Sequence, residues 1–312
     1  MDDSTAWLCG CGGALVVAAA AAGGAWLARG STAVPAALWG VTAAGSFALE
    51  MAVRAAGGLA DPAAAAATRL VSLALAVCPV MSLLGAKRPQ HGVWQFIVAS
   101  LGVVLALPAI SATLVRPGTP PDVHMLERGF LLILLVVGWM NFSGTRRSVA
   151  AALVTAGLAV LARAFLPFVP TAVAAAPLPQ FEALASGGLA VGAVVAVMQS
   201  VRAARRPFPA GPPASITALI DRPYVALRET LGAAWALRIA ERFNGAAAER
   251  GWPCRLHFRG LEVGDDSDDP DWQRDAVRAL RAVCRRFVTP DWLARHGWPE
   301  QPAAMAPLKE GR

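Results

Sequence analysis

The residues best placed to carry chemistry are a few polar groups that fall within or beside long apolar stretches. Glu50 is the only acid that the predicted spans place inside an apolar stretch, and Arg54 follows it at the i,i+4 spacing that lets a helical pair neutralise itself. A charge at the centre of a bilayer costs about 2.5–3.5 kcal/mol, so such a group is a functional hypothesis by default. We expect an interfacial ion pair, since both side chains can snorkel, and the alternative is an ion or proton site facing the bundle interior.

Two further polar residues lie near the ends of apolar stretches. Arg163 has the same two interpretations as Glu50, a charge at the interface or a polar site inside the bundle. We expect its side chain to snorkel to the interface. Asn141 is needed to bring its own stretch to the length of a membrane span. Glu50, Arg54, Arg163 and Asn141 therefore form the candidate intramembrane polar site.

A second candidate is a row of arginines on one face of a helix that begins at Pro270. Its members are Arg274, Arg278, Arg281 and Arg285, and a separate face carries the apolar stripe Trp272, Ala276, Leu280, Val283 and Phe287. A basic face beside a membrane suits anionic lipid or a partner protein, although a plain solvated face explains it equally well. Eighteen basic and fourteen acidic residues follow Val201, an excess too small for a nucleic-acid-binding module. We expect no nucleic-acid partner.

Motifs for metal or cofactor chemistry are absent from the sequence. The five cysteines and four histidines do not follow zinc-ligand spacings. The acidic run from Asp265 to Asp271 does not fit an EF-hand, because Pro270 stands where that loop needs glycine and Ala276 where it needs glutamate. Phosphate-binding glycine loops, GxSxG and HExxH are also missing. We therefore expect no metal, no cofactor and no identified catalytic residue, and we lean against an enzyme.

The elements that must position these residues are membrane helices. Hydrophobic residues make up 56% of the chain, above the roughly 45–50% of soluble domains, and the excess lies before Arg202. A span needs roughly 17–25 mainly apolar residues, because lipid cannot satisfy an open backbone. About seven spans are predicted within a membrane domain of residues 1–201, near 6–28, 33–53, 70–86, 93–115, 129–145, 149–165 and 183–201. The third and fifth are the weakest, and losing one would change the orientation.

The basic residues of the short loops predict the orientation. Every pair of adjacent basic residues in the predicted loops falls on one side of the predicted membrane. Examples are Lys87–Arg88 and Arg146–Arg147. The positive-inside rule makes that side cytoplasmic, which places the amino terminus outside and the carboxy-terminal region inside. The bias towards alanine and arginine is typical of a GC-rich bacterial genome, so we expect a multi-pass protein of a bacterial inner membrane.

The carboxy-terminal third is predicted to be a small, mostly helical cytosolic domain. Residues 202–214 form an arginine- and proline-rich linker, and the domain spans 215–312. One helix is expected from about Arg222 to Phe243, with Arg228 on its solvated face. The alternation from Cys254 to Phe258 predicts a strand without an identified partner, and two Pro-Asp-Trp triplets, beginning at Pro270 and Pro290, predict helix starts.

This architecture favours a non-enzymatic membrane subunit or scaffold whose cytosolic domain contacts proteins or lipid. Its expected partners are the lipid bilayer, other membrane subunits or a second copy of the chain. The alternative is a transporter of ions or small solutes, suggested by Glu50 and by prolines at positions 79 and 108 inside predicted spans. An intramembrane enzyme ranks third, since it requires several polar groups converging in one pocket.

Overall fold

The computed structural model describes residues 2–87, 91–169, 178–205, 215–264 and 270–298. Within these ranges the chain is mainly helical, with eleven α-helices that account for most of its residues. The prediction of a mainly α-helical fold is confirmed.

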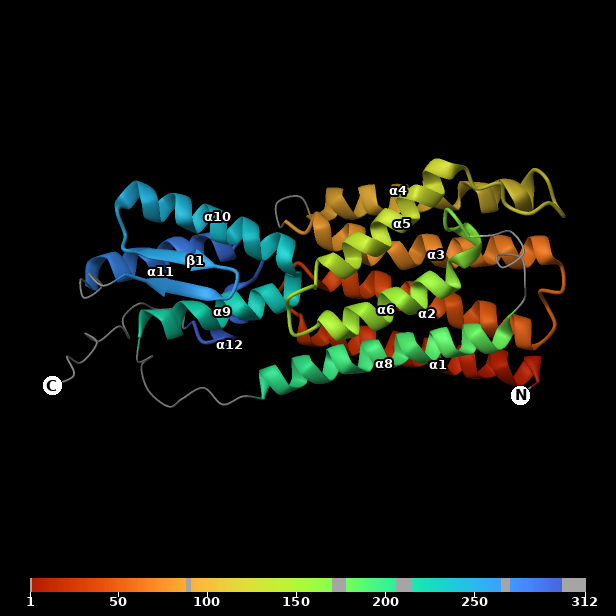
Figure 1. The fold of residues 1–312 in the computed structure, drawn as a ribbon, viewed down its shortest axis with the longest axis horizontal. Helices are drawn as coiled ribbons and strands as arrows, with labels where there is room; N and C mark the ends of the chain where they lie inside the picture. Colours follow the sequence, from red (N-terminus) through yellow and green to blue (C-terminus); the bar gives the residue numbers. More distant parts are fainter. Residues whose placement is uncertain (1, 88–90, 170–177, 206–214, 265–269, 299–312) are drawn as a thin grey trace.

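The first part of the chain forms an elongated bundle of apolar helices (Figure 1). Five are long and apolar enough to cross a membrane: α1 (Asp3–Leu27), α2 (Val34–Ala55), α3 (Pro62–Leu84), α4 (His91–Leu114) and α8 (Pro179–Ala204). Two are shorter, α5 (Met125–Met140) and α6 (Ser148–Leu161), and a 3-10 turn, η2 (Arg163–Phe165), follows α6. Five candidate spans are therefore established, and the count of seven stays a prediction.

Helix α3 begins eight residues before the predicted start of the third span. The carboxylate of Asp61 accepts hydrogen bonds from the backbone N–H groups of Ala63 and Ala64, and Pro62 occupies the first helical turn, where its missing N–H is not needed. This early start places Arg69 inside the helix, where the sequence had suggested a loop. Helix α8 likewise begins at Pro179 and includes Glu182, so the prediction that Glu50 is the only acid within an apolar helix is wrong.

The described residues of the carboxy-terminal third form what we call the C-terminal unit, in which four helices and one β-hairpin are seen. The helices are α9 (Ile216–Leu231), α10 (Ala233–Arg250), α11 (Pro270–Cys284) and α12 (Pro290–Arg295). Strands β1 (Cys254–His257) and β2 (Gly260–Val263) pair antiparallel, with Cys254 opposite Val263, so β2 is the partner that the predicted strand lacked. Both Pro-Asp-Trp triplets start helices as predicted.

Two predictions about the helix from Arg222 to Phe243 are corrected. The chain forms two helices there, because Gly232 adopts φ +87° and ends α9. Arg228 is buried and not solvated: its guanidinium donates to the carbonyl of Phe258 at 2.7 Å and to the carboxylate of Glu229. Five apolar residues at four-residue spacing across the two helices are nevertheless all buried in the core: Leu227, Leu231, Trp235, Ile239 and Phe243.

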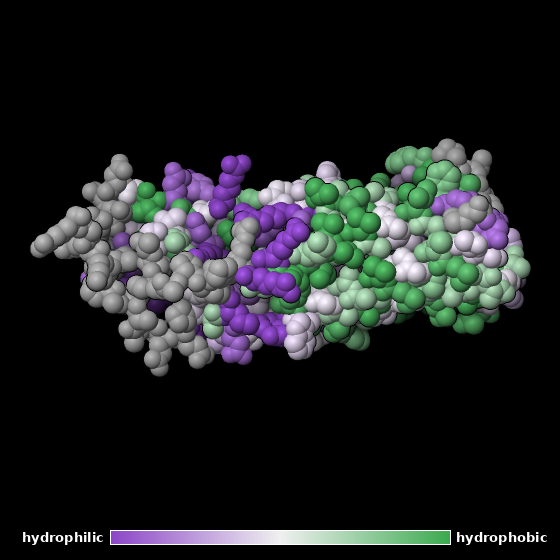
Figure 2. All heavy atoms as spheres, turned by 90° about the horizontal axis from the view of Figure 1, so that it is seen from below, coloured by the Kyte–Doolittle hydropathy of each residue, from purple (hydrophilic) through white to green (hydrophobic). Residues whose placement is uncertain are grey.

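The C-terminal unit sits on one end of the bundle, which we call the domain end, and the amino terminus lies at the opposite, far end (Figure 1). The space-filling view in Figure 2 shows a mostly apolar bundle surface and a band of hydrophilic residues where the bundle meets the C-terminal unit. Such a band is typical of the level at which a membrane helix leaves the hydrocarbon.

Candidate functional site

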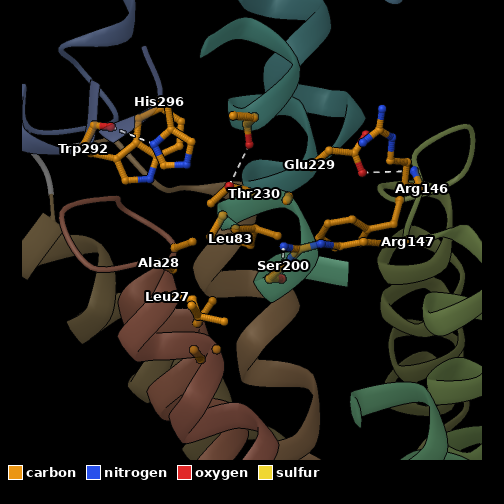
Figure 3. Close-up of a pocket in the computed structure, with 18 of the residues that line it drawn as sticks. Leu27, Ala28, Leu83, Arg146, Arg147, Ser200, Glu229, Thr230, Trp292 and His296 are labelled. Atoms are coloured by element: carbon orange, nitrogen blue, oxygen red, sulfur yellow. Dashed lines mark hydrogen bonds between the residues drawn. The ribbon is translucent and has the colours of Figure 1, made fainter. Parts of the chain in front are cut away.

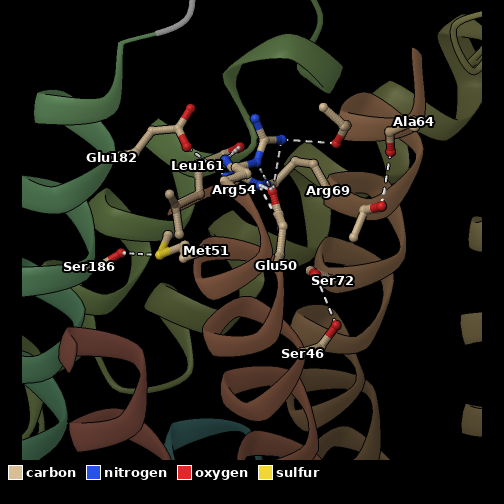
Figure 4. A network of polar contacts seen from close by, with 12 residues as sticks. Ser46, Glu50, Met51, Arg54, Ala64, Arg69, Ser72, Leu161, Glu182 and Ser186 are labelled. Carbon is tan, nitrogen blue, oxygen red and sulfur yellow. Dashed lines mark hydrogen bonds and ion pairs between the residues drawn. The ribbon is translucent and has the colours of Figure 1, made fainter. Parts of the chain in front are cut away.

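Charged side chains from three helices and the η2 turn form one buried cluster near the far end of the bundle, the far-end ion network. It consists of Glu50, Arg54, Arg69, Arg163 and Glu182. Figure 4 shows Glu50, Arg54, Arg69 and Glu182. Arg69 is at its centre: Nε lies 2.8 Å from Glu50 Oε1, and Nη2 lies 2.6 Å from Glu182 Oε2. The network ties α2, α3, η2 and α8 together at one level of the bundle.

The outer arginines complete the network. Arg54 pairs with Glu50 at 3.0 Å, the i,i+4 contact that the spacing predicts, and also donates to the carbonyl of Ala65. Its guanidinium lies 5.0 Å from the centre of the Trp7 ring, which brings α1 into the arrangement. Arg163 lies 2.9 Å from Glu182 Oε1. Each of the four carboxylate oxygens therefore has an arginine donor.

Glu50 lies inside the bundle, with no exposed surface. Removing a charge from water is expensive, and only close pairing with further hydrogen bonds offsets that cost. With its carboxylates fully paired, the network can hold helices in register. It can accept a proton or a cation only if an arginine moves away.

Arg69 and Glu182 were missed as site residues, although the sequence carries a signal for each. Asp61–Pro62 is a helix-start signature, and following α3 back to it would have enclosed Arg69. Pro179 likewise occupies the first turn of α8, but Leu178 before it makes no side-chain cap, so the signal there is the proline alone. The pairing itself is set by helix packing, which the sequence does not reveal.

Asn141 lies at the domain end, where it joins the bundle to the C-terminal unit. It follows α5 directly, and its carbonyl accepts a hydrogen bond from Ala233 N at 2.6 Å. Its side chain accepts from Ala234 N at 3.1 Å and donates to the carbonyl of Leu231 at 3.1 Å. One residue of the bundle thus satisfies free backbone groups at both the end of α9 and the start of α10.

Further hydrogen bonds hold the C-terminal unit on α1–α3. Thr32 N donates to the carbonyl of Phe287 at 2.9 Å, and Thr289 N donates to that of Gly30 at 2.7 Å. The indole N–H of Trp235 donates to the carbonyl of Leu83 at 2.8 Å. The contacts of Gly30 and Thr32 involve residues 287–289, far along the chain from the helix ends that Asn141 binds, so the unit is held in more than one place.

A cavity of about 950 Å³ lies in the junction between the bundle and the C-terminal unit, and we call it the junction cavity (Figure 3). The ends of α1–α3 supply apolar lining residues such as Leu27, Ala36 and Leu83. Five arginines and two carboxylates also line it: Arg29, Arg146, Arg147, Arg222, Arg295, Asp221 and Glu229. The cavity therefore combines an apolar wall with an excess of positive charge.

The arginine row of α11 lies on the C-terminal unit, where α11 packs against α10 and α9. Arg274 and Arg278 are exposed and form long ion pairs of 3.4 Å with Asp271 and Asp275 on their own helix. Arg281 is half-buried, and Arg285 is exposed and lies directly after the last residue of α11. The row is not part of either the far-end ion network or the junction cavity.

The described residues contain no candidate metal site, and the two cysteines of the C-terminal unit have a raised pKa. No three histidines, cysteines or acids converge there in a way that could hold a metal ion. All five cysteines are free, and burial raises the pKa of Cys284 to about 12 and that of Cys254 to about 11, which keeps both as thiols.

Compared with known proteins, the chain matches no family model, no curated protein and no solved structure at a significant level.

Proposed function

We propose that this is a non-enzymatic subunit or scaffold of a bacterial inner membrane, which holds its C-terminal unit in a fixed position on the cytosolic face. The observation that carries the proposal is the docking through Asn141, which bonds to both α9 and α10. A domain joined only by a linker turns freely, whereas one held at several backbone positions presents a constant surface to a partner.

The membrane arrangement that we propose has seven spans, with the amino terminus outside. Helices α5 and α6 have 16 and 14 residues and are roughly 24 and 21 Å long at 1.5 Å per residue, so they fall short of the hydrocarbon thickness unless their flanking turns are included. Arginines and a lysine gather at the domain end, among them Arg29, Lys87, Arg147 and Arg202, which favours the cytosol for that end.

The experiment that tests the scaffold is a mass measurement on protein extracted with its surrounding lipid into polymer-bounded discs. We expect an assembly larger than one chain. Asn141→Ala should reduce that assembly while still inserting into the membrane, because it removes the side-chain bonds to Leu231 and Ala234. Ser143→Ala is the matched control, since this exposed hydroxyl bonds only within its own turn. A stable, lone monomer of the unmodified protein would contradict the proposal.

Transport of an ion or small solute is the second candidate, and the burial of Glu50 inside the bundle favours it. The full pairing of Glu50 with arginines weighs against it, because no carboxylate oxygen is left for a cargo ion. Proteoliposomes loaded with a pH-sensitive or cation-sensitive dye would decide: a flux that Glu50→Gln abolishes would support transport. Equal leakage from empty and protein-containing vesicles would eliminate proton and cation transport.

A further inference from the structure

The junction cavity has two chemically different walls. The apolar wall comes from the domain ends of α1, α2 and α3 and includes Leu27, Ala36, Ala37 and Leu83. A second wall comes from the α5–α6 loop, the last turn of α8 and the helices of the C-terminal unit, and it carries four of the five arginines. The fifth, Arg29, follows the end of α1 at the edge of the apolar wall. A site with one apolar and one cationic side suits a ligand that is itself divided into an apolar part and an anion.

Arg147 forms the first cationic corner of the cavity. Figure 3 shows its side chain extended towards Ser200 of α8, and Nη2 donates to Ser200 Oγ at 2.7 Å. The hydroxyl is a neutral partner, so the positive charge of Arg147 is not balanced by this contact. Burial lowers the pKa of Arg147, and the negative charge of Glu229 opposes that shift. A guanidinium beside a hydroxyl is an arrangement that recognises phosphate oxygens.

The two carboxylates on the cavity wall are already engaged. Glu229 receives the guanidinium of Arg228 at 2.7 Å on Oε1 and the backbone N–H of Arg146 at 3.0 Å on Oε2. Asp221 Oδ1 accepts from Leu261 N at 2.6 Å. Asp221 thus makes a contact within the C-terminal unit, and Glu229 also joins that unit to the α5–α6 loop. With five arginines and two carboxylates, the lining of the cavity has a net positive charge.

A second cationic corner brings two like charges together. Arg295 donates to the backbone carbonyl of Arg29, and the guanidinium of Arg29 lies 4.3 Å from the centre of the Trp26 ring. Burial and then the charge of Arg29 lower the pKa of Arg295, while Asp291 opposes them. Neighbouring guanidinium groups that repel each other gain most from an anion placed between or beside them.

We propose that the junction cavity binds one anionic phospholipid from the leaflet at the domain end, with its phosphate against Arg147 and Ser200 and its acyl chain along the apolar wall of α1–α3. The cavity volume of about 950 Å³ lies within the roughly 300–1,000 Å³ of ligand pockets, which fits a headgroup and the first part of a chain. The hydrophilic band in Figure 2 lies where the bundle meets the C-terminal unit, and we place the lipid headgroups at this level. This inference goes beyond the scaffold proposal, because a lipid can occupy the cavity whether or not a partner protein is present.

The test is native mass spectrometry of the full chain, purified in detergent and titrated with phosphatidylglycerol or with zwitterionic phosphatidylcholine. We expect one phosphatidylglycerol adduct per chain that is preferred over phosphatidylcholine. Arg147→Gln should weaken that adduct at least about tenfold, since a charge-assisted hydrogen bond to phosphate is lost. Arg202→Gln is the matched control, because Arg202 is exposed on α8 nearby but does not line the cavity, and it should leave the adduct unchanged.

A second variant separates the lipid from a soluble phosphate compound. Ala37→Phe reduces the space along the apolar wall and leaves every arginine in place, so it should also weaken the binding of phosphatidylglycerol. In a separate competition experiment with the unmodified protein, free glycerol phosphate should not displace the lipid. The proposal is overturned if Arg147→Gln and Arg202→Gln weaken the adduct equally, because the bound lipid would then be a general shell around the bundle. It is also overturned if glycerol phosphate competes at the concentration of the lipid, since the cavity would then take a soluble anion. Melting curves without added lipid establish that the variants are folded.

Discussion

Arg69 is the residue on which the far-end ion network depends. It is the only member of the network that contacts both carboxylates, with Glu50 on one side and Glu182 on the other. It also lies 5.8 Å from the centre of the Phe47 ring and donates to the carbonyl of Leu161 at 3.4 Å. Its loss would leave two buried carboxylates with only the outer arginines as partners, a costly state in a medium that solvates charge poorly.

The first prediction follows from this position. Arg69→Met should lower the free energy of unfolding by about 3–5 kcal/mol, the usual cost of removing one partner from a buried ion pair. The measurement is unfolding of the purified protein in mixed micelles with increasing dodecyl sulfate, followed by tryptophan fluorescence. Arg116→Met, at an exposed position beyond α4, is the control and should change little. Equal unfolding midpoints for the two variants would show that the network does not stabilise the bundle.

The second prediction at the residue scale concerns pH and His296. Its ring stacks on Trp292 with centroids 3.7 Å apart, and burial lowers its pKa below the ordinary 6.5, with Arg295 adding to the shift and the carbonyl of Trp292 opposing it. A lowered pKa means that folding favours the neutral ring. The stabilisation is complete above about pH 6.5 and is lost as the pH falls through the folded-state value.

Thermal unfolding at two pH values checks this prediction. The melting temperature of the unmodified protein should decrease when the pH is lowered from 7.5 to 5.5. That of the His296→Gln variant should decrease less, because the glutamine side chain does not titrate. Parallel decreases in the two proteins would mean that His296 is not the group responsible.

At the scale of elements, the break between α9 and α10 is what allows the C-terminal unit to dock. Gly232 takes φ +87°, a conformation that costs little only for glycine, and a Cβ there would lie 2.6 Å from the carbonyl oxygen of Asn141. Both the backbone turn and the close approach of α5 therefore require glycine at this position.

Gly232→Ala should consequently destabilise the junction by at least about 1–3 kcal/mol, through backbone strain and displacement of Asn141. Gly245→Ala provides a matched control, because Gly245 lies within α10 with open space around it, and alanine there should stabilise the helix by about 0.5–1 kcal/mol. Limited proteolysis and melting curves would show the two substitutions acting in opposite directions. If Gly232→Ala melted at or above the unmodified protein, the junction would not depend on this glycine.

The helices and strands also show how much of the secondary structure could be predicted from the sequence. Apolar length predicted the long helices and the alternation at Cys254 predicted a strand, because each pattern depends on neighbouring residues alone. The single helix across Gly232 was a wrong prediction, since an isolated glycine is tolerated inside a helix at a cost of about 1 kcal/mol and so does not by itself predict a break. The contacts of Asn141 on both sides of the break involve residues about 90 positions away in the chain and leave no local pattern. Arg69 and Glu182 escaped for a similar reason: an ion pair between residues 113 positions apart depends on helix packing.

For the whole molecule, the decisive feature is that the bundle and the C-terminal unit share a junction. The linker composition of residues 202–214 suggested a tethered domain, and residues 206–214 lie outside the described ranges. The docking contacts come instead from the loop between α1 and α2, the ends of α3 and α5, and the segment around α12. The position of the C-terminal unit on the bundle is therefore set by these contacts and not by the composition of the linker alone.

The orientation proposed for the whole molecule gives the last prediction. Thr119 lies in the exposed loop beyond α4 at the far end, and Glu249 is exposed near the end of α10 in the C-terminal unit. A membrane-impermeant maleimide added to intact cells should label Thr119→Cys, and it should label Glu249→Cys only after the cells are permeabilised. The unmodified protein controls for the native cysteines, of which only Cys9 is exposed. If Glu249→Cys were labelled in intact cells and Thr119→Cys were not, the orientation would be the opposite of the one proposed. The arginines of the junction cavity would then lie at the outer leaflet.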